Sequence, residues 1–163
     1  MRKIMIPVAL TLVLMGCQNP TENHHSSNLQ NKDEMTIATE KNAIENLLFA
    51  YRDALNASDA SQVLPLYTQD GVFMPSGAPT TLGQEQVRAA YEFVFSNIQL
   101  NIEFSIDEVS VNGDYAFART TSKGTTLVHA SGETVPEENR ELFVLQKEDG
   151  AWKIARYMFN KMK

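Results

Sequence analysis

Apolar residues recur at helical spacing in three segments of the first half of the chain. The first predicts a helix from about Thr36 to Asn56, whose stripe is Ile44, Leu47, Leu48, Tyr51 and Leu55. Ser58 or Asp59 is expected to cap a second, short helix that Pro65 kinks or stops. A third helix is expected after Gly83, with Val87, Ala90, Tyr91 and Val94 on one face.

Strand patterns dominate after Ile98. Stretches 100–111, 114–129, 139–147 and 151–160 are strand-like and are separated or interrupted by Asn112-Gly113, Ser131-Gly132 and Asp149-Gly150. A further strand is expected at 72–74. Helices followed by antiparallel hairpins indicate an α+β fold. We therefore expect three helices packed on one face of a strongly curved, mostly antiparallel sheet of four to six strands, a cone that encloses a pocket.

The N-terminus has the pattern of a secretory signal. Arg2 and Lys3 precede the largely apolar stretch 4–15, which is too short to span a membrane. Gly16-Cys17 resembles the end of a bacterial lipoprotein signal, which implies that residues 1–16 are removed and that Cys17 is acylated and anchors the protein stably. The alternative is an ordinary signal with an incidental cysteine. Gln18 after the cysteine implies the periplasmic face of the outer membrane in a Gram-negative host.

Composition narrows the choice of partners. Residues 17–35, from Cys17 onward, are polar and are expected to form a flexible tether, which leaves 36–163 as one domain. Without the first 16 residues the chain has 12 Lys+Arg against 20 Asp+Glu, a formal charge of −8 that argues against nucleic acid. Cys17 is the only cysteine, and no metal-ligand spacing or phosphate-binding loop is present, so we expect no metal and no cofactor.

The last hairpin places candidate chemistry on one face of the sheet. A two-residue Asp149-Gly150 turn sets Phe143 opposite Arg156 and Glu141 opposite Met158. Glu141 and Arg156 then become diagonal neighbours on a mostly apolar face, either orienting a ligand or forming a structural pair or a solvated face. A one-residue slip would remove this argument. The opposite face would hold Leu142, Val144, Tyr157 and Phe159, four large apolar residues that favour a homodimer.

Several motifs resemble the nuclear-transport-factor-2-like superfamily, in particular its SnoaL-like and ketosteroid-isomerase-like domains. They are 50–59 (AYRDALNASD), 66–73 (LYTQDGVF), 74–79 (MPSGAP) with Gly83, and 149–156 (DGAWKIAR). Ketosteroid isomerase uses an Asp base, with a Tyr and a protonated Asp as oxyanion donors. The resemblance implies that Tyr51 takes the tyrosine position and Glu141 lies near the acid-donor position. The base position falls at Met74 or Pro75, where no proton acceptor exists.

Two functions are therefore expected to compete. The first is a pocket that binds a small, largely hydrophobic molecule, with catalysis left open because no catalytic set is complete. Its candidate lining is Tyr51, Tyr67, Met74, Glu141, Phe143, Arg156, Met158 and Asn160. The second is a non-catalytic, dimeric interaction module of the cell envelope. A cavity of about 300 Å³ or more beside Arg156 would favour the first.

Overall fold

The computed structural model describes residues 22–162, with side chains described from residue 34. The chain divides into two compact units, residues 1–34 and 35–163. The helices are α1 (Glu22–Asn56), α2 (Ala60–Val63) and α3 (Gly83–Asn97), and the 3-10 turn Leu64–Leu66 follows α2. No helix within 22–162 is long and apolar enough to cross a bilayer.

The start of α1 differs from the sequence-based expectation. Residues 22–35 are helical, although their polar composition predicted a flexible tether and a helix start near Thr36. The segment 21–56 contains neither glycine nor proline. Because extending an existing helix adds one hydrogen bond for each residue fixed, a polar sequence without a breaker can be helical. Polarity was therefore the wrong signal for the backbone conformation of this segment.

The short elements that follow α1 confirm the expected turn chemistry. Ser58 has a positive φ of 52°, and Asp59 caps α2 by accepting a hydrogen bond from the Ser61 backbone N–H at 2.8 Å. Pro65 lies in the 3-10 turn that ends this short helix. α3 begins at Gly83 as predicted, where φ is +71°, a conformation that favours glycine.

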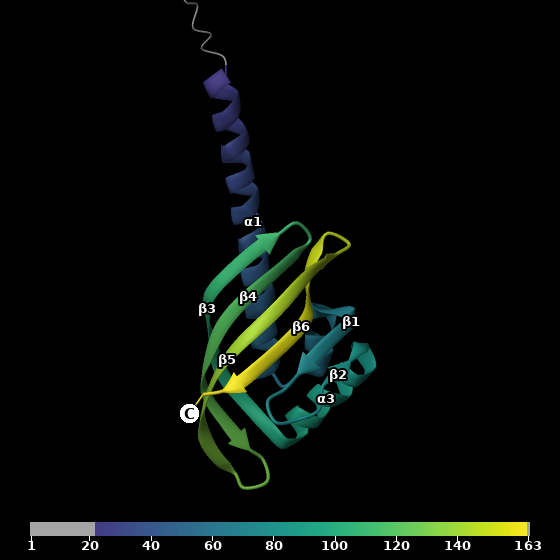
Figure 1. Ribbon diagram of the computed structural model, residues 1–163. Coiled ribbons are helices and arrows are strands. Elements are labelled where there is room, and N and C mark those ends of the chain that lie inside the picture. The colour runs from purple at the N-terminus through teal and green to yellow at the C-terminus, as the bar shows by residue number, and fades with distance from the viewer. Residues whose placement is uncertain (1–21, 163) are drawn as a thin grey trace, which may run out of the picture. The chain divides into compact units, whose positions relative to one another are not determined.

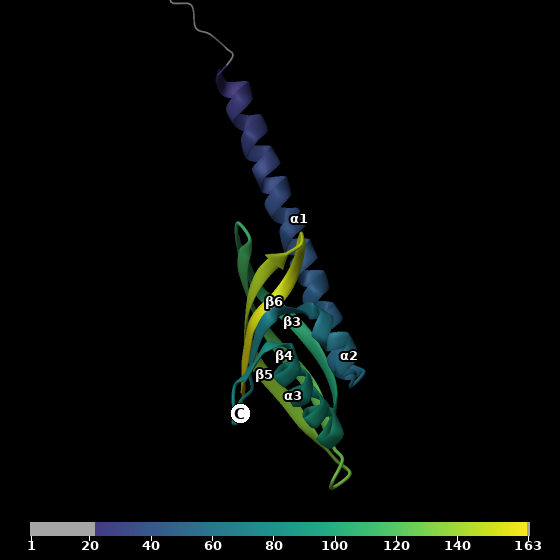
Figure 2. The same ribbon diagram turned by 90° about the vertical axis from the view of Figure 1, so that its right-hand side faces the viewer.

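Within residues 22–162, six strands form one mostly antiparallel sheet (Figure 1). They are β1 (Tyr67–Met74), β2 (Thr81–Leu82), β3 (Ile98–Asn112), β4 (Tyr115–Val128), β5 (Glu133–Glu148) and β6 (Ala151–Lys161). Their order is β2-β1-β6-β5-β4-β3, and only the β1–β6 pair is parallel. Figure 2 shows α2 and α3 on one side of this curved sheet. The α+β fold predicted from the order of helical and strand patterns is confirmed.

A β-bulge at Ala155 changes the register of the last hairpin. Next to the Asp149-Gly150 turn the pairing is as predicted, with Leu145 opposite Ile154. Ala155 is then an extra residue, so that Val144 opposes Arg156 and the remaining pairs shift by one. The shift exchanges the two faces of β6 beyond residue 155. Tyr157, Phe159 and Lys161 therefore join the inner face, whereas Arg156, Met158 and Asn160 lie on the outer face.

The predicted face assignments change accordingly. Glu141 opposes Phe159 rather than Met158, so the expected Glu141–Arg156 pair does not form. Arg156 instead forms an ion pair with Asp70, with 3.1 Å between Nη2 and Oδ2. The outer face keeps Leu142 but loses Tyr157 and Phe159, and its exposed apolar side chains include Phe117, Leu142 and Met158. A homodimer through this face stays a prediction.

Gly124 lies where the neighbouring backbone of β3 leaves no room for a side chain. It pairs with Ile102 of β3 and with Glu137 of β5. A Cβ atom at this position would lie 2.0 Å from the Asn101 carbonyl oxygen and 2.8 Å from the Ile102 Cα atom. Both contacts are with backbone, which cannot move aside without disturbing the ladder. Glycine in a strand interior often marks such an approach or bend, and here the approach lies beside the inner-face residue Ile102.

Candidate functional site

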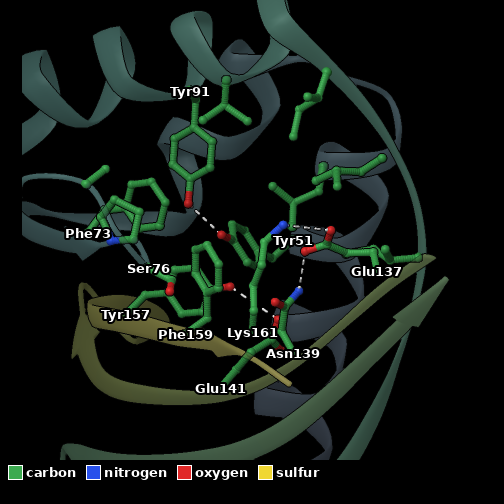
Figure 3. A pocket seen from close by; sticks show the side chains of 17 residues that line it. Tyr51, Phe73, Ser76, Tyr91, Glu137, Asn139, Glu141, Tyr157, Phe159 and Lys161 are labelled. Carbon is green, nitrogen blue, oxygen red and sulfur yellow. Dashed lines mark hydrogen bonds and ion pairs between the residues drawn. The ribbon is translucent and has the colours of Figure 1, made fainter. Parts of the chain in front are cut away.

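A cavity of about 220 Å³ lies between the inner face of the sheet and helices α1 and α3 (Figure 3). Most of its wall is apolar or aromatic, and its polar side chains come chiefly from β5. The lining residues are Tyr51, Leu55, Phe73, Pro75, Ser76, Ala78, Tyr91, Val94, Ile98, Leu100, Ile102, Glu137, Asn139, Glu141, Tyr157, Phe159 and Lys161. A concave, mostly apolar site with few polar groups is typical of small-molecule binding.

Three tyrosines from different elements share a chain of hydrogen bonds at the helical side of the cavity. The hydroxyl oxygens of Tyr51 (α1) and Tyr91 (α3) are 2.5 Å apart, and those of Tyr67 (β1) and Tyr91 are 2.8 Å apart. Burial raises the pKa of all three hydroxyls well above the usual range. The chain therefore consists of neutral hydroxyl groups at ordinary pH, and the Tyr51 and Tyr91 side chains also line the cavity.

Glu141 supplies a buried carboxyl group on the opposite wall. Its residue is 4% exposed, and its oxygens accept hydrogen bonds from Thr120, from Ser122 at 2.9 Å and from Tyr157 at 3.3 Å. No cation forms an ion pair with it among the side chains of residues 34–162. Burial raises the pKa of Glu141, and the three hydroxyl hydrogen bonds oppose that effect. A carboxyl group whose pKa is raised can hold its proton at a higher pH, and in that protonated form it can donate a hydrogen bond.

A second polar group lies farther along the same face of β5. Glu137 is 7% exposed and accepts hydrogen bonds from Thr126 at 3.0 Å and from the Asn139 amide at 3.0 Å. Lys161, at the end of β6, forms an ion pair with this carboxylate, with 3.2 Å between its Nζ atom and Oε2, the oxygen that Thr126 also contacts. The Asn139 amide also contacts the Ser122 hydroxyl at 3.3 Å. Since Ser122 bonds Glu141, the two carboxyl groups are joined through Asn139 and Ser122.

The structure places two of the eight candidate residues, Tyr51 and Glu141, on the cavity wall. Tyr67 and Phe143 are buried behind it: Tyr67 bonds Tyr91, and the ring of Phe143 stacks on that of Tyr157 with centroids 4.4 Å apart. Their side chains support the wall and do not line the cavity.

The other four candidates lie outside this cavity. Arg156, Met158 and Asn160 were assigned to the wrong face because the hairpin register omitted the bulge at Ala155. Met74 ends β1 opposite Met158 and is not part of the lining, although its neighbour Pro75 is. The criterion of a cavity of about 300 Å³ or more beside Arg156 is therefore not met as stated, because the cavity of about 220 Å³ lies on the face of the sheet opposite Arg156.

Sequence reasoning missed most of the polar wall. Asn139, Glu137 and Lys161 were not among the candidate residues. Strand alternation outward from Glu141 predicts both Asn139 and Glu137, because β5 has no irregularity between them. Lys161 and Tyr157 follow only once the bulge in β6 is known, and no sequence signal marks Ala155 as the extra residue.

Comparison with known proteins agrees with this architecture. A ketosteroid isomerase-like protein from Erwinia carotovora atroseptica SCRI1043 is 35% identical, with a TM-score of 0.71 over 74% of this chain and 95% of that one. A conserved protein from Planctomyces limnophilus DSM 3776 is 20% identical, with a TM-score of 0.66 over 77% and 99%. A proposed dehydratase of the NTF2-like family from Streptomyces avermitilis is 19% identical, with a TM-score of 0.66 over 77% and 98%.

The last two similarities concern the fold alone. A search of curated proteins gives no match. The sequence of residues 48–157 matches the SnoaL-like domain, and this range includes the end of α1, all of α3 and most of the strands that form the cavity. Together with the six-stranded sheet and its helices, this match shows that the chain belongs to the SnoaL-like domain family, within the NTF2-like fold.

Proposed function

We propose that the domain binds a small, largely hydrophobic, uncharged molecule and holds one of its oxygens at Glu141. The observation that carries the proposal is a buried carboxyl group on the wall of an otherwise mostly apolar cavity, with no cationic partner among the described side chains. A protonated carboxyl group in an apolar site is a good donor to a ligand carbonyl, as in the ketosteroid isomerase pattern. The aromatic rings of Phe73, Tyr157 and Phe159 supply flat apolar surface.

The size of the cavity limits the ligand. A volume of about 220 Å³ equals the share of about seven water molecules at ~30 Å³ each, below the ~300 Å³ common for drug-sized ligands. A bicyclic aromatic ketone such as 2-acetylnaphthalene is a suitable probe of this size. The position that would hold a base in the ketosteroid isomerase pattern carries Met74 and Pro75, neither of which accepts a proton. We therefore propose binding and assign no reaction.

The binding of 2-acetylnaphthalene is expected to depend on Glu141 and on pH. The protonated carboxyl group is the donor, so affinity is greatest below the raised pKa of Glu141 and falls as the pH rises through it. Glu141→Gln keeps a neutral donor and should remove this pH dependence. Glu141→Leu should weaken binding by about tenfold, the cost of one hydrogen bond of ~1.4 kcal/mol. Calorimetric titration across pH measures both effects.

Glu138→Gln is the matched control, because Glu138 lies three residues before Glu141 on the same strand and pairs with Lys123 at 2.7 Å on the outer face. It should bind like the unchanged protein. If Glu141→Leu binds the ketone as tightly as the control, the role of Glu141 is wrong. If 2-acetylnaphthalene does not bind at all, that result favours the alternative function, an interaction module. Its exposed face would then include Phe117, Leu142 and Met158.

We also propose that Cys17 anchors the protein to the cell envelope through a lipid. This residue lies outside the part of the chain that the structure describes. The full-length protein expressed in a bacterium should incorporate a palmitate analogue and sediment with membranes. Cys17→Ser should lose both properties. The double variant Cys17→Ser/Ser27→Cys moves the thiol away from the signal and should also remain unlabelled. Labelling of either variant would contradict the lipoprotein assignment.

A further inference from the structure

Asn139 carries a buried hydrogen-bond acceptor that has no partner among the residues the structure describes. The residue is 5% exposed and lines the cavity, and its Oδ1 atom forms no hydrogen bond with any described residue. The Nδ2 group of the same amide, by contrast, donates hydrogen bonds to Glu137 Oε1 at 3.0 Å and to Ser122 Oγ at 3.3 Å. Buried polar side-chain atoms are nearly always paired, so an unpaired one calls for an explanation.

The orientation of the amide follows from its neighbours. Exchanging Oδ1 and Nδ2 would place the amide oxygen against the Glu137 carboxylate, an acceptor that offers no proton. Nδ2 must therefore face Glu137, and the atom left over is an acceptor. The donors of this hydrogen-bond network bond other acceptors, because Thr126 and Lys161 bond Glu137 while the Ser122 hydroxyl bonds Glu141. A molecule in the cavity, a ligand or a water, can supply the donor for Oδ1.

The separation of Asn139 and Glu141 along β5 determines how far apart the two polar ends of a ligand must be. The two residues are neighbours on the same face of β5, and alternate residues of a strand are about 7 Å apart. A flat molecule lying along the strand can therefore meet both groups, with one end at each. Figure 3 shows Glu137, Asn139 and Glu141 following one another along this wall beside Tyr157.

We propose that the ligand has two polar ends: an oxygen acceptor that binds at Glu141 and a hydrogen-bond donor, a hydroxyl or N–H group, that binds at Asn139 Oδ1. This inference rests on the proposed function and adds the ligand class to it. A phenolic or hydroxylated ketone fits the description. A ligand with an ether or a carboxylate at the second end does not, because each would place another acceptor against Oδ1 and near Glu137.

Three probes that differ at one position test the proposal. They are 2-acetylnaphthalene, its 6-hydroxy derivative and its 6-methoxy derivative, titrated calorimetrically into the unchanged protein below the pKa of Glu141. The 6-hydroxy compound is expected to bind about tenfold more tightly than either of the others, as one satisfied buried acceptor predicts. In Asn139→Ala the three affinities should fall within about twofold of one another. Asn160→Ala, a change of the same kind on the outer face, should keep the tenfold preference.

The outcomes separate this inference from the proposed function. If 2-acetylnaphthalene binds in a Glu141-dependent manner but the hydroxyl gives no advantage, the donor site is wrong and the pocket stands. A preference that persists in Asn139→Ala also overturns the assignment, since the donor would then bind elsewhere. If none of the three probes binds, the proposed function fails with it. The comparison of probes in the unchanged protein does not depend on the folding of any variant.

Discussion

Gly124→Val is expected to prevent the domain from folding, or to lower its free energy of unfolding by about 4 kcal/mol or more. Its Cβ atom would overlap the Asn101 carbonyl oxygen at 2.0 Å, and the branched methyl groups would add to that overlap. The clash is with backbone, so relief requires separating β3 from β4. Urea denaturation followed by circular dichroism measures the loss, with insoluble expression as the extreme outcome.

Lys123→Val is the control for this change. Lys123 is the preceding residue of β4, its side chain is exposed, and its ion pair with Glu138 is of the surface kind that contributes little. Valine there should change the free energy of unfolding by less than about 1 kcal/mol. Equal stability of Gly124→Val and the control would show that β3 does not approach β4 as closely as described.

Phe143→Ala should lower the free energy of unfolding by about 3–5 kcal/mol. The side chain is 0% exposed, stacks on Tyr157 at a centroid distance of 4.4 Å and contacts the ring of Tyr51 at 5.7 Å. Its removal leaves a cavity beneath the proposed ligand-binding wall. The midpoint and slope of urea denaturation give the change in stability.

Phe117→Ala provides the matched comparison for Phe143→Ala. Phe117 lies on the outer face, opposite Val144, and is 38% exposed. The same truncation should therefore cost about 1 kcal/mol or less in the monomer, where less apolar surface is lost from the interior. A larger loss for Phe117 than for Phe143 would contradict the assignment of inner and outer faces. A loss that grows with protein concentration would instead support the predicted homodimer.

The sequence was sufficient for the fold where side-chain periodicity was strong. The stripe from Ile44 to Leu55 lies in the buried core, and Asp59, Pro65 and Gly83 act at helix boundaries as their chemistry predicts. The start of α1 was wrong because polarity reports on burial and not on backbone conformation. The hydrophobic pattern also did not predict the parallel pairing of β1 with β6, because neither strand carries a local sequence signal for its pairing partner.

Of the cavity-lining residues, the sequence predicted only those whose position does not depend on the register of the β5–β6 hairpin. Tyr51 and Glu141 were found because one belongs to a helical stripe and the other lies on β5, whose pairing with β4 is regular. Arg156 was misplaced because a single unpaired residue reversed the alternation of β6. Tyr91 was recognised as part of a helical stripe, but its hydrogen bonds to Tyr51 and Tyr67 join residues far apart in sequence.

The bulge at Ala155 has a consequence for how relatives of this protein diverge. Beyond it, β6 carries two interleaved sets of residues: Tyr157, Phe159 and Lys161 meet the cavity, whereas Arg156, Met158 and Asn160 meet the surroundings. Loss of one codon at this point would exchange the two sets without changing any other residue. An alignment that places its gap one position away would therefore match cavity residues of one protein with surface residues of another. A single inserted residue therefore decides which side chains of β6 line the cavity and which lie on the outer face.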